Sequence, residues 1–145
     1  MLVMNKLDFM KKFRPDELCI KEFENWIIVL RRKQTTLGDA VILLKREVPD
    51  ISKMNKEEST EFPSVVQWYE DICRKKFGAE KFNYVVMMMH DNYVHYHAFP
   101  RYNKEVNYFD INWEDEGDKN VLDNFGLSQI SDEKTLFRIR DYMIQ

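Results

Sequence analysis

The chain has 145 residues, of which 44% are hydrophobic and 32% are charged. Such a chain can bury one core but is short for two ordinary domains, so we expect a single domain over residues 1–145. Acidic and basic residues are interspersed and the formal net charge is −3, a balance that excludes the broad basic surface typical of duplex nucleic-acid binding.

The first third of the chain predicts a short helix followed by two strands. Apolar residues recur at a helical spacing over residues 5–13, and this helix ends before a proline. The apolar run 26–30 suits a buried strand, and the polar segment 31–36 breaks it. Gly38 then precedes a second apolar run, residues 39–44, which we expect to be the antiparallel neighbour of the first.

The main helix is predicted over residues 56–77. Asn55 and Glu58 have the spacing of a capping box, an apolar stripe follows at helical spacing, and Gly78 marks the end. Pro63 lies inside this stretch and cannot donate a helical hydrogen bond. We therefore expect a kink there or a later start of the helix.

Two further strands are predicted after the main helix. Residues 82–89 have strand-like composition, and the pair Asp91 and Asn92 tolerates the positive φ values of a tight hairpin turn. The next strand is expected over residues 93–99, where Pro100 would stop it.

The remaining tail completes the expected fold class. It is acidic and rich in turn-forming residues after Trp113, and it ends in a short helix with Ser131 as the expected cap. Together the elements predict an α+β fold in which an antiparallel sheet of about five strands carries the main helix on one face, with short helices toward both ends.

The cysteines and the N-terminal stretch bear on location. Cys19 and Cys73 are far apart in sequence and do not form a disulfide framework, which favours a reducing compartment. Charged residues interrupt residues 1–13, so that stretch lacks the apolar core of a secretory leader, and no apolar run is long enough to span a bilayer. We expect a cytoplasmic protein without a membrane partner.

All three histidines, His90, His95 and His97, lie within eight residues. If residues 93–99 form a strand, alternation places His95, His97 and Tyr93 on one face. The two imidazoles then stand side by side, with α-carbons about 7 Å apart from a rise of about 3.3 Å per residue.

The spacing of His95 and His97 alone leaves several interpretations open. An imidazole titrates near neutral pH, which suits a nucleophile or base beside a proton donor. The same spacing also fits two solvated side chains on a strand face, or an anion pocket without catalysis. A metal site would need a third ligand, which His90 could supply only if the hairpin folds it onto the same face.

The segment around the histidines resembles the histidine-triad family. In that family a strand carries His-x-His-x-His, followed by two apolar residues and often Pro-Arg. Here Tyr93-Val-His95-Tyr-His97-Ala-Phe-Pro100-Arg101 matches from the second histidine onward, in the manner of a bacterial branch that lacks the first histidine.

A second match lies upstream of the histidines. The family has a strand, a loop that ends in glycine, and a strand that closes with a basic pair. The chain has 26–30, Gly38 and 41–44, followed by Lys45 and Arg46. The resemblance covers roughly residues 18–102 and leaves 103–145 as a C-terminal extension.

This resemblance implies a nucleotide hydrolase or nucleotidyl transferase. His95 matches the family's nucleophile, which attacks the α-phosphorus of a nucleoside phosphate or dinucleoside polyphosphate, such as a diadenosine polyphosphate, to form a nucleotidyl-histidine. His97 matches the third histidine, which contacts the phosphate and helps the leaving group depart. A backbone acceptor on one ring nitrogen of His95 would leave the other for attack. The family further implies a homodimer without a redox cofactor.

The chain departs from the family pattern at several positions. Tyr93 occupies the place of the first histidine, and Arg31 falls where many members hold the ribose with an acidic or amide residue. We name Tyr93, Arg31, Asn92 and Arg101 as candidate substrate-binding residues, and we expect the loop 31–37 and the hairpin turn 90–92 to frame the phosphate pocket. These departures make a nucleotide-binding or regulatory module with little or no turnover the alternative to an enzyme.

Overall fold

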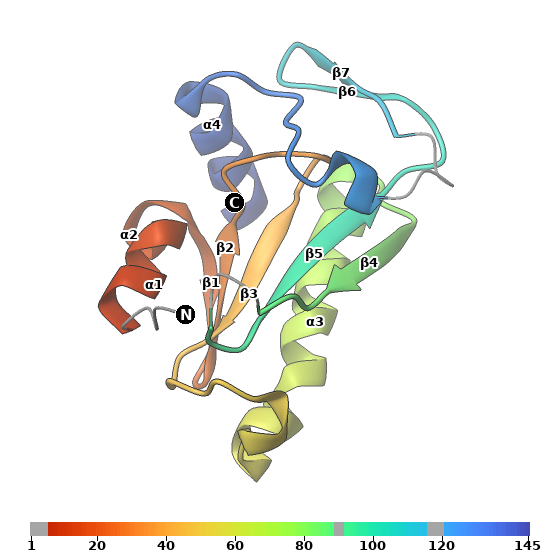
Figure 1. Cartoon of the computed structure of the whole chain (residues 1–145). Coiled ribbons are helices and arrows are strands. Elements are labelled where there is room, and N and C mark those ends of the chain that lie inside the picture. Colours follow the sequence, from red (N-terminus) through yellow and green to blue (C-terminus); the bar gives the residue numbers. More distant parts are fainter. Residues whose placement is uncertain (1–5, 89–91, 116–120) are drawn as a thin grey trace.

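A five-stranded antiparallel sheet organises the part of the chain that the computed structural model describes, residues 6–88, 92–115 and 121–145. The order of the strands across the sheet is β1-β2-β3-β5-β4 (Figure 1). The strands are β1 (Cys19–Glu22), β2 (Trp26–Leu30), β3 (Ala40–Leu44), β4 (Lys81–Val85) and β5 (His95–Arg101). The α+β class and the antiparallel sheet expected from the sequence are therefore confirmed.

The two strands β2 and β3 are apolar at every position, and all ten of their residues are buried. They pair antiparallel, with Ile28 opposite Ile42. A strand without a polar face must be covered on both sides of the sheet. The fold therefore needs one layer over each face.

Helix α3 (Lys56–Phe77) covers one face of the sheet. The ring of its Phe62 lies 4.8 Å from the Trp26 ring of β2 and 4.6 Å from the Tyr96 ring of β5, centroid to centroid. Farther along the helix, the buried Tyr69 hydroxyl donates to the Gly38 carbonyl at 2.7 Å. These contacts fix α3 across the central strands.

The start of α3 is held firmly enough to tolerate Pro63 inside the helix. Asn55 accepts from the Glu58 amide, and the Glu58 carboxylate accepts from the Asn55 amide, both at 2.8 Å, so the predicted capping box is confirmed. Arg46 also pairs with the Glu58 carboxylate at 2.9 Å. The helix starts at Lys56, so the expectation of a later start is wrong. The contacts at its N-terminus offset the helical hydrogen bond that Pro63 cannot donate.

The remaining elements come from the two ends of the chain. They are α1 (Lys6–Phe13), α2 (Pro15–Leu18), the 3-10 turns η1 (Ile51–Lys53) and η2 (Val121–Asn124), the hairpin β6 (Val106–Tyr108) and β7 (Ile111–Trp113), and α4 (Glu133–Ile144). Figure 1 shows α1 and α2 beside β1, and the hairpin beyond the end toward which β5 runs. The terminal helices expected from the sequence are confirmed.

The histidine strand is shifted by two residues from its predicted position. It runs from His95 to Arg101 rather than from 93 to 99, and it includes Pro100. The proline is tolerated because β3 pairs with β5 only as far as Ala98, so no bond to β3 is lost. The expectation that Pro100 stops this strand is wrong.

Two other predicted boundaries also change. Strand β4 ends at Val85, short of the predicted end at residue 89, and the side chain of Met87 is exposed. The turn predicted at Asp91 lies outside the described residues. Asp132, not Ser131, caps α4, because its carboxylate accepts from the Thr135 amide at 3.0 Å. A carboxylate at this position also interacts favourably with the positive end of the helix dipole.

Candidate functional site

Strand β5 presents His95 and His97 on the face of the sheet opposite α3. Because Tyr96 packs against Phe62 of α3, its neighbours on either side must point the other way. The two imidazole centroids lie 5.2 Å apart, with their planes at 75°. The side-by-side arrangement predicted from the sequence is present.

His95 is oriented by a backbone carbonyl. Its Nδ1 lies 2.7 Å from the Tyr93 carbonyl oxygen. A carbonyl can only accept, so Nδ1 donates its hydrogen, and in the neutral ring the lone pair is on Nε2. The ring of Phe13, at the end of α1, lies 5.8 Å away, and His95 is only 1% exposed.

His97 occupies a drier and more confined position than its spacing alone suggests. The ring of Phe125 lies edge-on to it at 4.8 Å, and its backbone pairs with Val41 on one side and Val85 on the other. Burial lowers the pKa of His97 to about 3, with smaller contributions from His95, Arg31 and Lys12. The ring is therefore neutral at physiological pH, and among the described residues its buried Nδ1 has no hydrogen-bond partner.

A cavity of about 580 Å³ opens beside His97. Among the described residues, its lining has no acidic side chain but holds the basic residues Lys12, Arg31, Arg32 and Lys33. Apolar side chains form much of the rest: Phe13, Leu30, Met87, Leu122 and Phe125. A cavity of this kind suits a ligand that has one anionic and one apolar part.

Arg31 is held by several partners rather than projecting freely into this cavity. It pairs with the Asp39 carboxylate at 2.9 Å and donates to the Phe125 carbonyl at 2.6 Å. The centre of its guanidinium lies 4.1 Å from the centroid of the Phe125 ring. Asp39 is fully buried, and this burial raises its pKa to about 8 although Arg31 acts in the opposite direction.

Asp39 and Phe125 are site residues that the sequence did not single out. An acidic residue next to Gly38 could have suggested a partner for one of the nearby arginines, such as Arg31 eight residues earlier. Phe125 offered no such signal, because its contacts with Arg31 and His97 join distant parts of the chain.

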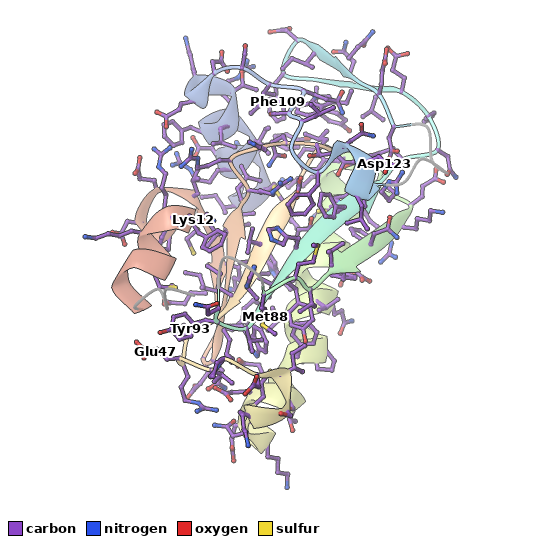
Figure 2. All side chains as sticks on the ribbon, in the orientation of Figure 1. Lys12, Glu47, Met88, Tyr93, Phe109 and Asp123 are labelled. Atoms are coloured by element: carbon purple, nitrogen blue, oxygen red, sulfur yellow. The ribbon has the colours of Figure 1, made fainter. Side chains whose placement is uncertain are left out.

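Tyr93 and Asn92 precede the histidine strand. Because β5 begins at His95, alternation does not place the Tyr93 side chain beside the imidazoles, and its contact with His95 is made by its carbonyl. Asn92 is half-buried, and within the described part of the chain its Nδ2 lacks a hydrogen-bond partner. Figure 2 shows Tyr93 near the end of the sheet where β5 begins and Asp123 near the opposite end.

Arg101 lies at the far end of β5 from the histidines. It forms two bonds of 2.9 Å to the Asp115 carboxylate and donates to the side-chain Oδ1 of Asn83 at 2.7 Å. The structure places it beside a separate cavity of about 270 Å³ and not at the cavity of His97.

Metal ligands and membrane-spanning segments are two further features on which the described residues bear. They contain no group of three or more histidine, cysteine or acidic side chains able to hold a metal ion, and His90 lies outside them. Their helices include none that is both long enough and apolar enough to cross a membrane.

Comparison with known proteins identifies the fold. No family model and no curated protein matches the sequence. Among solved structures, a Hit-like protein involved in cell-cycle regulation from Bartonella henselae has a TM-score of 0.66 at 16% identity, over 99% of this chain and 98% of its own. A histidine triad protein from Bradyrhizobium japonicum has a TM-score of 0.67 at 10% identity, over 97% and 93%.

A third similar structure is a histidine triad protein from Sinorhizobium meliloti, with a TM-score of 0.66 at 14% identity over 92% of each chain. All three matches extend over nearly the whole chain, including the part after residue 102. The chain has the histidine-triad fold.

Proposed function

We propose that this protein is a nucleotide hydrolase or nucleotidyl transferase, with His95 as the nucleophile at the α-phosphorus of a nucleoside phosphate or dinucleoside polyphosphate. One observation carries the proposal. The Tyr93 carbonyl fixes Nδ1 of His95 as the donor, so the lone pair of the neutral ring is on Nε2. A nucleophilic imidazole needs this tautomer.

The reaction has two steps. In the first, Nε2 of His95 forms a bond to the α-phosphorus, the bond from phosphorus to the leaving-group oxygen breaks, and the leaving group departs with its electron pair. In the second, the oxygen of water attacks the same phosphorus and the phosphorus–nitrogen bond breaks. The products are a nucleoside monophosphate, a proton and the free imidazole.

His97 and the basic lining assist this chemistry by contacts with the phosphate. A neutral His97 can donate one N–H to a phosphate oxygen. Lys12, Arg32 and Lys33 lower the energy of the added negative charge. The apolar part of the lining suits a nucleobase.

The other candidate residues take different places in the proposal. Arg31 forms part of the pocket wall, and Tyr93 acts through its carbonyl. Asn92 has a buried amide group that a ligand oxygen would satisfy. Arg101 would contact only a ligand that reaches beyond the histidine cavity and competes with Asp115.

A second candidate function follows from the low exposure of the imidazoles. His95 is 1% exposed and does not line the cavity, whereas His97 does, so a ligand in the cavity must move Phe13 to reach His95. A site closed in this way also fits a nucleotide-binding or regulatory module with little turnover. Binding without product would identify this alternative.

The deciding experiment incubates the purified protein with nucleoside phosphates and dinucleoside polyphosphates and separates the products by chromatography. We expect release of a nucleoside monophosphate, which His95→Ala abolishes. His97→Ala, as the matched variant on the same strand, should slow release less. Rapid quenching should trap nucleotide mass on the peptide that contains His95, and unchanged turnover in His95→Ala would contradict the assignment.

We further propose a cytoplasmic homodimer, as the resemblance to histidine-triad proteins implies. Strand β4 is the edge of the sheet next to the histidine strand, and its residues from Phe82 to Val85 are only partly buried. Light scattering coupled to gel filtration measures the mass directly. A mass of one chain would contradict the dimer.

A further inference from the structure

The segment 121–129 is part of the C-terminal extension, yet it contacts the histidine site. Its Phe125 lies 4.8 Å from His97, ring centroid to ring centroid, at an interplanar angle of 74°. Leu122 and Gly126, from the same segment, also line the cavity beside His97. The extension therefore forms one wall of the site.

Arg31 and Asp39 hold Phe125 in this position. The guanidinium of Arg31 stacks on the ring at 4.1 Å and donates to the Phe125 carbonyl at 2.6 Å, so it fixes the side chain and the backbone of the same residue. Asp39, which is fully buried, pairs with Arg31 from the other side at 2.9 Å. The ring cannot turn away from His97 without losing its contact with the Arg31 guanidinium.

Hydrogen bonds fix the rest of the segment to the loop that follows β2. The Thr35 hydroxyl donates to the Leu127 carbonyl at 2.6 Å, and the Gln34 amide donates to the Ser128 hydroxyl at 3.1 Å. The Gln129 amide returns a bond of 3.0 Å to the Gln34 carbonyl. The segment is thus joined to the site loop at several successive residues.

We infer that Phe125 is a positioning residue for His97: its ring, held by Arg31 and Asp39, keeps water from the imidazole and fixes its plane beside His95. The catalytic consequence rests on the proposed function. A neutral His97 donates to a phosphate oxygen without placing a second positive charge against the His95 ring. The segment 121–129 is therefore a working part of the histidine site.

The charged surroundings of His97 agree with this role. The groups whose charge acts on it are His95 on its own strand, Arg31 at the end of β2 and Lys12 on α1, and each disfavours a cationic His97. Burial, to which Phe125 contributes, is the largest cause of the lowered pKa. Removal of the ring should admit water and make protonation of His97 easier.

The test measures the protonation of His97 by NMR titration of the imidazole nitrogens. We expect wild-type His97 to stay neutral down to about pH 5. Phe125→Ala should raise its proton affinity about tenfold or more, and Phe125→Leu, which keeps an apolar side chain over the ring, should raise it less. Leu127→Ala is the matched control, because that side chain is exposed and only its carbonyl bonds Thr35.

Two results would overturn the inference. One is a wild-type His97 that titrates near its ordinary pKa of about 6.5, a measurement that needs no variant. The other is a folded Phe125→Leu or Phe125→Ala protein in which the titration of His97 is unchanged.

Turnover separates this inference from the proposed function. In an active protein, Phe125→Ala should add an acidic limb to the pH–rate profile at the new pKa of His97, whereas a ring that only supports the fold would lower the rate equally at every pH. A wild-type protein without turnover would contradict the proposed function, and the NMR titration would still decide the role of Phe125.

Discussion

The two faces of the sheet are covered by different kinds of structure. On one face lies α3, a single helix of 22 residues whose capping box and apolar stripe are encoded locally. On the histidine face, the cover comes from both ends of the chain, with Phe13 of α1 over His95 and Phe125 over His97. The first face builds the core, whereas the second encloses a reactive pair, and substitutions should separate these two roles.

The largest expected effect is on the histidine face and on activity alone. His95→Ala should lower turnover by about a thousandfold or more, since the variant loses the nucleophile of the proposed reaction. The unfolding temperature should fall only modestly, because the buried His95 ring leaves a cavity but β2, β3 and α3, which form the core, are not altered. Chromatographic assay and thermal unfolding on the same preparation measure both quantities. A loss of folded protein large enough to explain the loss of turnover would contradict the separate role of the histidine face.

The opposite result is expected on the α3 face. Trp26 packs on Phe62, and its indole donates to the Glu58 carbonyl at 3.0 Å. Trp26→Ala should lower the free energy of unfolding by about 3–5 kcal/mol through the cavity that it leaves. Urea denaturation measures this loss. The folded fraction should keep its activity per molecule, and a selective loss of turnover would contradict the assignment of this face to the core.

Arg31 joins the two roles. Arg31→Ala removes the guanidinium that bonds the buried Asp39 carboxyl and the Phe125 carbonyl, and buried polar groups left without their partners cost about 1–3 kcal/mol. We therefore expect a lower unfolding temperature together with weaker nucleotide binding. Lys33→Ala, at the exposed rim of the same cavity, is the control and should weaken binding without a loss of stability. An unchanged unfolding temperature in Arg31→Ala would show that the contacts of Arg31 with Asp39 and Phe125 do not stabilise the fold.

The local features of the sequence predicted most of the α3 face but only part of the histidine face. The capping box at Asn55 and the alternation of His95 and His97 depend on residues close in sequence, and both are confirmed. The strand boundary at Pro100 depends on where β3 ends, which no local pattern shows. The contact of Arg31 with Phe125 spans 94 positions, so it follows only from the folded chain.

The pH dependence of stability should show opposite contributions from two buried groups. The pKa of His97 is lowered from 6.5 to about 3, so below about pH 6.5 the unfolded chain binds a proton that the native chain does not. Its contribution to the free energy of unfolding is therefore lost as the pH falls from about 6.5 toward 3. His97→Asn should flatten this acidic arm in urea titrations at successive pH values.

Asp39 should act with the opposite sign. Its pKa is raised from 3.8 to about 8, so over this range the native chain holds a proton that the unfolded chain has released. Its contribution is lost as the pH rises from about 4 to 8. Asp39→Asn should remove this decrease in the free energy of unfolding with pH. If the free energy of unfolding of the wild type instead rose from about pH 4 to 8 relative to that of Asp39→Asn, the raised pKa would be contradicted.

The smallest effect is expected at Tyr93, although its side chain is the clearest departure from the histidine-triad pattern. The contact that orients His95 is made by the Tyr93 backbone carbonyl. A substitution of the side chain preserves this contact as long as the backbone does not rearrange. Because β5 begins two residues later, the alternation that places both imidazoles on one face does not by itself place the phenol beside them. Tyr93→Phe should therefore lower turnover by less than about tenfold, whereas loss of a donor that acts on transition-state charge costs a hundredfold or more. Tyr93→His restores the missing imidazole and provides the converse test: on this geometry it should leave hydrolysis near the wild-type rate, and a gain would show that the third imidazole limits the reaction. A hundredfold loss in Tyr93→Phe would instead show that the hydroxyl, not only the carbonyl, belongs to the site.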